Sequence, residues 1–428
     1  MNILCLYDNT QTYTTTVFEH ITSFSESIAH KYFFSHQDQR YGLSINFSHF
    51  DAIIIHYSVR LPYNQISEKN AELLSDYKGL KVLFIQDEYD YTYRAWEWIK
   101  QLGIKLVFTV VPENNINKIY PPDKLPGIKF VSNLTGYVPE GFSQGVRVSS
   151  PSERKIVIGY RGRPLHVKYG QLGLEKVGVG SLVKEFCKSE GIQHDIEWSE
   201  ETRIYRHKWY EFISSCRAML GSESGSNVFD WDGTLTDKIN KYRITNPHAS
   251  DDEVYTELIQ PLEMPGLMNQ ASPRIFEAIS VRTILVLFEG DYSGVVTAGI
   301  HYIPLKKDGS NLDEVFKLLG DSNYVDTMAE RAYQDIIASG KYSYNNFVHM
   351  VEKEIEQTIQ GLTPATSNSR QNYPTIADLS DPTFITTSPI RAQPPLYKYK
   401  IMFRTIRYIW RLIPEATRTS LKIRLKRL

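Results

Sequence analysis

The sequence has 428 residues, of which 42% are hydrophobic and 23% are charged, and its net charge is −1. This length is too great for one ordinary domain, and the composition is that of a globular protein, so we expect two domains with sizeable cores. The three cysteines include no Cys-x-x-Cys pair, which argues against a disulfide framework and a zinc site.

The N-terminus shows no targeting signal. Its apolar run is short and has no basic region before it, and no apolar run in the chain reaches about 18 residues. Neither a signal peptide nor a membrane-spanning helix is therefore predicted. We expect a cytoplasmic protein.

The first 150 residues alternate between short apolar runs and stretches of helical length. The expected strands are 3–7, 52–56, 81–86, 106–111 and 129–131, and the clearest expected helices are 65–78 and 92–102. Runs that are apolar throughout are typical of parallel strands covered on both faces. Residues 1–150 are therefore predicted to form a Rossmann-like, doubly wound α/β domain.

A polar stretch, 139–154, separates this pattern from a second one. Further strands are expected at 156–159, 195–198, 218–221, 283–288 and 301–304, with helices at 181–189, 205–214, 273–280 and 323–338. Residues 151–360 are therefore predicted to form a second Rossmann-like domain. An acidic insertion, 227–265, is long for a loop and should carry structure of its own or form a flap.

The last part of the chain has a different composition. Residues 361–395 are rich in Thr, Ser, Pro and Asn without periodicity, which is typical of a flexible linker. The tail 396–428 has a net charge of +9, so the rest of the chain carries −10.

The basic residues Lys400, Arg404, Arg407 and Arg411 recur in the tail at helical spacing, and Phe403 and Trp410 lie among the apolar ones. A basic amphipathic helix of this kind is typical of a segment that binds the inner face of an anionic membrane. The alternative is that the tail packs on the acidic body of the chain or on a partner subunit. The acidic body argues against a nucleic acid partner.

A glycine-rich segment after the expected strand 156–159 is the strongest candidate for a binding loop. It contains Arg161, Gly162, Arg163 and Lys168. Glycine lets the backbone approach a ligand closely, and arginine binds phosphate oxygens in a bidentate way. Ligands bind beyond the carboxyl ends of strands in open α/β sheets. The segment therefore favours phosphate binding over an ordinary solvated basic loop.

A helix followed by a strand, 272–288, has Glu277 in its first turns. Together with the loop that contains Arg163 and Lys168, this helix resembles the donor domain of group-1, family-4-like glycosyltransferases of the GT-B type. The likeness covers about 151–345 and is nearest to their divergent spore-coat-type, surface-polysaccharide branch. Glu277 matches the second glutamate of the Glu-x7-Glu motif, but Asn269 replaces the first, and Glu223 is the candidate to take its place in space.

The resemblance implies a glycosyltransferase whose donor is a nucleotide-diphosphate sugar and whose acceptor is a polysaccharide or a lipid-linked glycan of the cell surface. Arg161, Gly162, Arg163 and Lys168 would bind the diphosphate, and Glu277 the ribose. Because the basic loop neutralises the leaving group, no metal and no cofactor are expected. In the first domain, His56 and Asp87 follow expected strands and are candidates for a general base, although strand-end capping would also explain them.

Two other functions remain open at this stage. The sequence from Phe229 to Asp237 matches the Asp-x-Asp-Gly-Thr signature of haloacid-dehalogenase-like phosphatases, with Asp230 as nucleophile and Mg²⁺ as cofactor. The residues before it are polar and contain glycine, whereas that chemistry needs a buried strand there. The loss of the first motif glutamate is instead compatible with a catalytically degenerate, glycosyltransferase-like scaffold.

Overall fold

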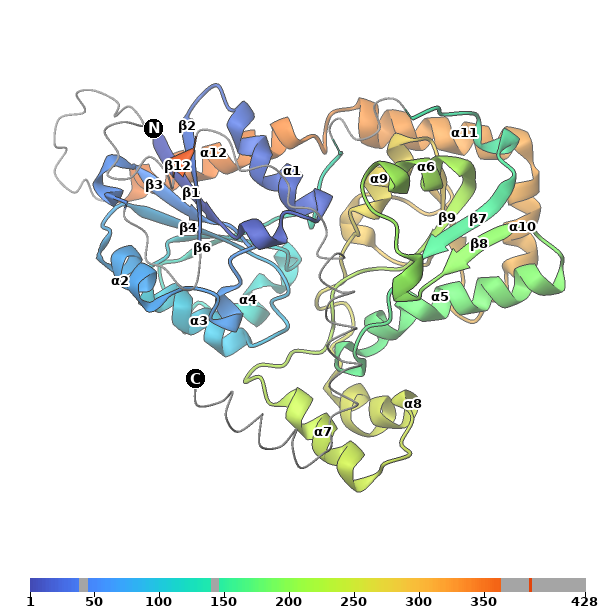
Figure 1. Ribbon diagram of the computed structural model, residues 1–428, viewed down its shortest axis with the longest axis horizontal. Helices are drawn as coiled ribbons and strands as arrows, with labels where there is room; N and C mark the ends of the chain where they lie inside the picture. The colour runs from blue at the N-terminus through green and yellow to red at the C-terminus, as the bar shows by residue number, and fades with distance from the viewer. Residues whose placement is uncertain (38–44, 140–145, 363–384, 387–428) are drawn as a thin grey trace, which may run out of the picture.

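The computed structural model describes residues 1–37, 45–139, 146–362 and 385–386, which form two α/β domains side by side (Figure 1). The predicted linker 361–395 and basic tail 396–428 therefore lie almost entirely outside the described residues. Within them, no helix is long and apolar enough to cross a membrane.

The first domain is built on a seven-stranded sheet of order β12-β2-β1-β3-β4-β5-β6. The strands are β1 (Asn2–Tyr7), β2 (Lys31–His36), β3 (Ala52–Ile55), β4 (Leu80–Ile85), β5 (Leu106–Thr109), β6 (Lys129–Ser132) and β12 (Ile385–Thr386). All neighbouring strands are parallel except β12, which pairs antiparallel with β2. Because β2 and β3 flank β1 on opposite sides, the strand order reverses there, and a crevice is expected beyond the carboxyl end of β1.

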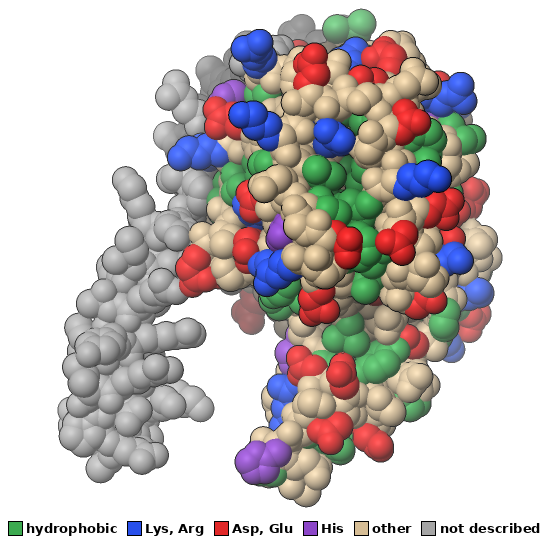
Figure 2. Space-filling view, turned by 90° about the vertical axis from the view of Figure 1, so that its right-hand side faces the viewer, with side chains coloured by type: hydrophobic (Ala, Val, Ile, Leu, Met, Phe, Trp, Pro, Cys, Tyr) green, Lys and Arg blue, Asp and Glu red, His purple; other side chains and the backbone are tan. Residues whose placement is uncertain are grey.

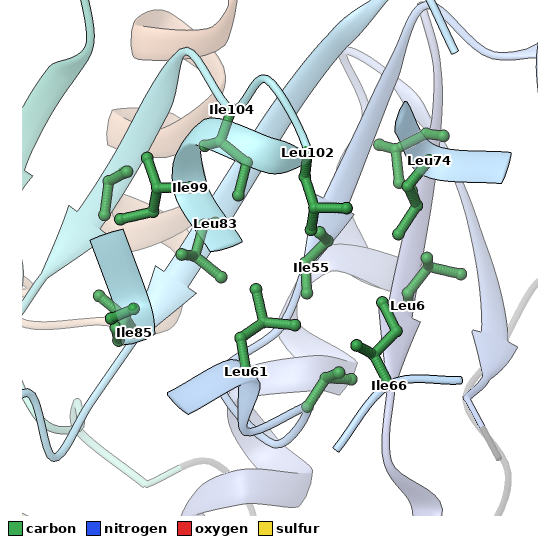
Figure 3. Packing of buried hydrophobic residues seen from close by; sticks show 14 of the residues in the cluster. Leu6, Ile55, Leu61, Ile66, Leu74, Leu83, Ile85, Ile99, Leu102 and Ile104 are labelled. Atoms are coloured by element: carbon green, nitrogen blue, oxygen red, sulfur yellow. The ribbon is translucent and has the colours of Figure 1, made fainter. Parts of the chain in front are cut away.

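Both faces of this sheet are covered. One face packs against α2 (Glu68–Asp76), α3 (Thr92–Gln101) and α4 (Ile116–Ile119), in a core of leucine and isoleucine that includes Leu6, Ile55, Leu83 and Ile99 (Figure 3). The other face packs against α1 (Thr15–Ser23) and α12 (Tyr344–Gly361). Burial on both faces explains why the strands are apolar throughout.

The last described helix, α12, returns from the second domain to the first (Figure 1). Phe347, Val351 and Ile355 of α12 are fully buried against side chains of the first sheet, including Phe84. The segment predicted as the second domain, 151–360, therefore ends in a helix that belongs to the core of the first domain.

The second domain has a five-stranded parallel sheet of order β11-β10-β9-β7-β8. Its strands are β7 (Ile156–Arg161), β8 (His194–Glu197), β9 (Cys216–Gly221), β10 (Ile284–Phe288) and β11 (Tyr302–Leu305). One face packs against α6 (His207–Ser215) and α9 (Arg274–Ser280), and the other against α5 (Gly170–Ser189), α10 (Leu312–Gly320) and α11 (Ser322–Ala332). The strand order reverses between β7 and β9.

The acidic insertion forms a small lobe with its own core. The lobe contains α7 (Leu235–Thr245) and α8 (Asp251–Val254), followed by a π-helical turn, Tyr255–Ile259. Its core includes Leu235, Ile239 and Val254. The lobe projects below the second domain (Figures 1 and 2), and Asp and Glu side chains are visible on its surface (Figure 2). The prediction that this insertion carries its own structure is confirmed.

Two Rossmann-like parallel sheets confirm the predicted fold class, and every strand that the sequence predicted is present. The sequence did not predict β2. It also placed the start of α5 near residue 181, whereas this helix begins at Gly170. The first half of α5 contains several glycines, which have low helix propensity. Gly180, near the middle, has a packing reason: a Cβ there would lie 3.0 Å from the Tyr160 ring.

Candidate functional site

A cleft lies between the two domains at the carboxyl end of β7. The first domain contributes residues 13–16, at the start of α1, and the second domain contributes the segment after β7, the segment before α6 and the start of α9. The lining residues are Tyr13, Thr14, Thr15, Thr16, Arg161, Gly162, Arg163, Arg203, Ile204, Tyr205, Arg206, Trp209, Ser272, Pro273, Arg274 and Glu277. This is the position at which α/β folds bind ligands.

Arginines dominate the polar lining of this cleft. Arg163 is exposed, and its guanidinium has no hydrogen bond or ion pair with any residue that the structure describes. Arg203 pairs with Glu200 at 3.2 Å, and Arg274 donates to the Arg161 carbonyl at 2.6 Å. The cleft therefore offers cationic groups to an anion, and Arg163 is the one without competing partners among the described residues.

Arg161, also predicted to bind the donor, is held by contacts within the second domain. Its guanidinium lies 2.9 Å from the Asp195 carboxylate and 4.2 Å from the centre of the Phe212 ring. It also donates to the carbonyls of Tyr160, Asp195 and Thr202. Although Arg161 lines the cleft, these contacts occupy most of its donors.

Gly162 allows two elements to approach closely. A Cβ at this position would lie 2.8 Å from the carbonyl oxygen of Lys176 in α5. The glycine therefore brings the end of β7 close to α5, which is a packing role, and Gly162 also lines the cleft.

Glu277 lies at the floor of the cleft, where α9 presents it beside Trp209 of α6. The indole Nε1–H donates to Glu277 Oε2 at 2.7 Å. Burial raises the pKa of Glu277, and the Trp209 hydrogen bond and nearby Arg274 partly counter this. The Trp209 donor therefore fixes one carboxylate oxygen of Glu277.

Lys168 is directed away from the cleft lining. Its Nζ lies 2.6 Å from Oδ1 of Asp90, a buried residue of the first domain. The hydroxyls of Tyr63 and Tyr169 donate to the other oxygen of Asp90, at 2.5 and 3.1 Å. The lysine predicted to bind phosphate therefore forms an ion pair between the two domains.

The insertion lobe strengthens the same domain contact. Asp230 and Asp90 form an isolated parallel bridge, in which Asp230 N–H donates to Tyr89 O and Tyr91 N–H donates to Asp230 O. The next residue, Trp231, packs against Tyr93 of α3. Backbone pairing and aromatic packing thus join the lobe to the first domain on one side of the Lys168–Asp90 ion pair.

Glu223, the proposed substitute for the first motif glutamate, lies next to Asn269. The Asn269 side-chain amide donates to Glu223 Oε2 at 2.5 Å, and the N–H groups of Asp291 and Tyr292 donate to Oε1 at 3.1 Å each. Glu223 is only 5% exposed and is not among the cleft-lining residues. Its carboxylate holds the segment after β10 in place.

His56 is fully buried in the first domain. The Ser58 N–H donates to His56 Nδ1 at 3.0 Å, which places the proton on Nε2, and Nε2 donates to His20 Nδ1 at 3.0 Å. Phe347 of α12 packs on His20, 4.5 Å between ring centroids. His56 therefore lies beneath α12 and does not face the cleft, contrary to the expectation that it faces an acceptor.

The buried histidine pair predicts a loss of stability in acid. Burial lowers the pKa of His20 to about 3, whereas an unfolded histidine has a pKa of about 6.5. Below pH 6.5 the unfolded state therefore binds more protons than the folded state. Between pH 7 and pH 5, His20 alone should cost about 2 kcal/mol of the free energy of unfolding.

Urea unfolding at both pH values, with a His20→Gln variant, measures this effect. The wild-type chain should lose about 2 kcal/mol more than the variant. A His349→Gln variant, which removes an exposed histidine, should behave like wild type. Equal pH dependence in the wild-type chain and the His20 variant would rule out a buried neutral His20.

Asp87 follows β4 at the domain contact. Its carboxylate accepts a hydrogen bond from the Tyr89 hydroxyl at 2.6 Å and lies 3.6 Å from the guanidinium of Arg60. It is about half exposed and is not among the residues that line the cleft. The structure therefore separates the three predicted catalytic residues, His56, Asp87 and Glu223, from one another.

The surroundings of Asp230 differ from those of a phosphatase nucleophile. Asp230 follows no strand of either parallel sheet, and its carboxylate accepts a hydrogen bond from the Leu235 N–H at the start of α7. Within the described part of the chain, no group of three His, Cys, Asp or Glu side chains is placed to hold a metal ion. The Asp-x-Asp-Gly-Thr sequence begins with Asp230, whose backbone joins the lobe to the first domain by hydrogen bonds.

Several cleft residues were not predicted from the sequence, notably Trp209, Arg203, Arg206 and Arg274. Arg206 has a positive φ of 56° immediately before α6, which is unusual for an arginine. For Arg203, Arg206 and Trp209, the signal that could have found them is their position after the expected strand 195–198, at the same sheet edge as Arg163, whereas Arg274 begins the helix that contains Glu277.

Known proteins support the fold assignment. No family model and no curated protein matches this sequence. The solved structure of an alpha-glucosyltransferase with UDP and a 13-mer DNA containing an HMU base matches with a TM-score of 0.51 at 11% identity, over 83% of this chain and 99% of that chain. This likeness shows that the chain has the GT-B fold.

Two further solved structures give TM-scores below 0.5. A DNA-modifying beta-glucosyltransferase matches with 0.47 at 12% identity, over 83% of this chain and 100% of that chain. Anabaena Alr3699/HepE in complex with UDP and glucose matches with 0.44 at 10% identity, over 83% of this chain and 100% of that chain.

Proposed function

We propose that this protein is a metal-independent glycosyltransferase that uses a nucleotide-diphosphate sugar as donor. The observation that carries the proposal is the arginine-lined cleft between the two GT-B domains, in which Arg163 has no competing partner among the described residues and Glu277 is held in place. An alpha-glucosyltransferase of the same fold has been solved with UDP bound.

In this mechanism, Arg163 stabilises the negative charge that develops on the diphosphate as the bond to the sugar breaks. Glu277 accepts hydrogen bonds from the ribose hydroxyls through the carboxylate oxygen that Trp209 leaves free. The acceptor enters from the first domain, opposite the arginines, and is a polysaccharide or a lipid-linked glycan.

A panel of nucleotide sugars, monitored by thermal unfolding of the full chain, tests the proposal. UDP, UDP-glucose and the corresponding GDP and dTDP compounds are compared with uridine, in the presence of EDTA. A bound donor should stabilise the folded chain by about 2.7 kcal/mol at 100 times its Kd. If no diphosphate or sugar diphosphate stabilises the chain, a degenerate scaffold replaces the enzyme as the better interpretation.

A Trp209→Phe variant should raise the donor KM about tenfold with little change in kcat, because it removes a hydrogen bond to a charged carboxylate while keeping an aromatic ring. For a donor that lacks the ribose 2′-hydroxyl, the same substitution should raise KM less than it does for the normal donor. The matched control is Trp98→Phe, which removes the hydrogen bond that Nε1 of Trp98, on α3, donates to Asn64 Oδ1. If the two variants behaved alike, Trp209 would have no role in donor binding.

We further propose that the basic tail, 396–428, holds the enzyme at the inner face of an anionic membrane, where a lipid-linked acceptor is presented. Each basic residue near such a surface contributes about 1 kcal/mol. The full chain should float with anionic vesicles at low salt and detach as salt rises, and a chain that ends at Pro395 should not float. Failure of the full chain to float at low salt would contradict membrane attachment.

A further inference from the structure

A second pocket lies between the two domains beside the cleft, and none of the described residues lines both. The first domain contributes the segments that follow β5 and β6, and the second domain contributes the segments before α9 and after β10. The lining residues are Pro112, Glu113, Ser132, Asn133, Leu134, Tyr137, Gln270, Asp291, Ser293 and Gly294. Both sheets therefore present carboxyl ends of strands to this pocket, which is where α/β folds bind ligands.

A contact between two connecting segments separates this pocket from the cleft. Thr135 Oγ1 donates to the Ala271 carbonyl at 2.5 Å, and a Cβ at Gly136 would lie 2.8 Å from the Pro273 side chain. The residues that precede Thr135 and Ala271 line the pocket, and the two that follow Ala271 line the cleft. A molecule in the pocket therefore does not occupy the place of the donor.

The pocket has one carboxylate from each domain. Glu113 and Asp291 are both exposed, and neither carboxylate has a hydrogen bond or an ion pair with any residue that the structure describes. None of the described lining residues is a lysine or an arginine. Because an ionised carboxylate only accepts hydrogen bonds, these two groups require a ligand with hydroxyl or amine donors.

A buried amide in the same pocket offers the opposite half of the hydrogen-bonding pattern. Asn133 is 7% exposed, and its Oδ1 accepts from the Tyr137 hydroxyl. Its Nδ2 has no acceptor among the described residues, which is unfavourable at a buried position. A ligand oxygen in the pocket would satisfy it. Amide donors beside carboxylate acceptors suit hydroxyl groups, since a hydroxyl both donates and accepts.

The loop after β10 is built to hold its carboxylate at the pocket. Tyr292, Ser293 and Gly294 have φ values of 50°, 55° and 65°, and a positive φ is unfavourable for the first two. Buried Glu223 stabilises this backbone, because its Oε1 accepts from the N–H groups of Asp291 and Tyr292 at 3.1 Å each. Glu223 is therefore a positioning residue for Asp291.

We propose that this pocket binds a sugar unit of the acceptor glycan next to the unit that reacts in the cleft. Glu113 and Asp291 accept hydrogen bonds from the sugar hydroxyls, and Asn133 donates to them. The inference rests on the proposed function, which makes a glycan the acceptor. Since two carboxylates without a neutralising cation repel an anion, the bound sugar is neutral or carries an amine.

Saturation-transfer NMR of the full chain with defined tetrasaccharides tests this proposal. The probes are maltotetraose, tetra-N-acetylchitotetraose, tetraglucosamine and a hyaluronan tetrasaccharide, which is acidic. At least one of the first three should bind, and the hyaluronan fragment should not. Binding of none of the first three, or equal binding of the acidic one, would overturn the proposal.

Competition with UDP locates the sugar. Saturating UDP should leave tetrasaccharide binding unchanged, because the contact between Thr135 and Ala271 separates the pocket from the cleft. Displacement of the tetrasaccharide by UDP would place the sugar in the cleft and would contradict a separate pocket.

Variants assign the binding groups. Asp291→Asn and Glu113→Gln keep the shape of each exposed side chain and remove its charge, so each should weaken tetrasaccharide binding about tenfold without changing the melting temperature. Asn133→Asp removes the amide donors but keeps an acceptor for Tyr137, and should weaken binding several-fold. The matched control is Asp313→Asn, an exposed position on α10, which should bind like wild type. Normal binding by both carboxylate variants would show that the sugar binds elsewhere.

The outcomes separate the two proposals. If the chain binds UDP but none of the tetrasaccharides, the sugar pocket is wrong while the glycosyltransferase proposal stands. If the chain binds a tetrasaccharide in this pocket but no nucleotide, the glycosyltransferase proposal is wrong, and the chain binds glycans without transferring a sugar.

Discussion

An Asp90→Ala variant should have a free energy of unfolding about 3–5 kcal/mol lower than that of the wild-type chain. Asp90 is 2% exposed and is the anionic partner of Lys168, whose side chain is 13% exposed. Removing the carboxylate leaves a poorly solvated ammonium group between the domains. It also removes the acceptor of the Tyr63 and Tyr169 hydroxyls.

Urea unfolding followed by tryptophan fluorescence measures the loss. In the double variant Asp90→Ala, Lys168→Met, no charge remains without a partner, so it should be more stable than Asp90→Ala alone. The matched control is Asp251→Ala, which removes the exposed ion pair with Arg243 in the lobe and should cost at most about 1 kcal/mol. A double variant as unstable as the single one would show that the ion pair is not the cause.

Most strands could be predicted from the sequence because they contain apolar runs, as expected where both faces of a sheet are covered, although β8 (His194–Glu197) has only one apolar residue. β2 was missed because its short aromatic run, at 32–34, is flanked by polar residues. The first half of α5 was missed because it is rich in glycine, which has low helix propensity, and one of these glycines, Gly180, lets α5 approach Tyr160. That reason exists only in the tertiary structure.

For the site, the sequence predicted which helices and strands border the cleft, but it did not predict the partners of the individual side chains. Arg163 was predicted from the glycine-rich loop after a strand, and Glu277 from the resemblance to a known family. Both line the cleft. Lys168 was predicted from the same loop and His56 from its position after a strand, but their partners, Asp90 and His20, come from other parts of the sequence. Position at a strand end therefore does not determine which way a side chain points.

The prediction with the largest effect on activity concerns Arg163. An Arg163→Ala variant should lower kcat/KM for the donor about 10²- to 10³-fold, because it removes a preorganised donor to the leaving diphosphate. Its stability should change little, because Arg163 is exposed and its guanidinium contacts no described residue through a hydrogen bond or ion pair.

The comparison with Arg161 makes this prediction specific. An Arg161→Ala variant should lose stability, because Arg161 binds Asp195 and packs on Phe212, whereas Arg163→Ala should lose activity at normal stability. Arg331→Ala, which changes an exposed arginine on α11, should affect neither. Initial rates with a saturating acceptor and varied donor, beside melting temperatures, distinguish the three. A fully active Arg163→Ala variant would mean that the exposed arginine of the cleft does not act on the leaving group.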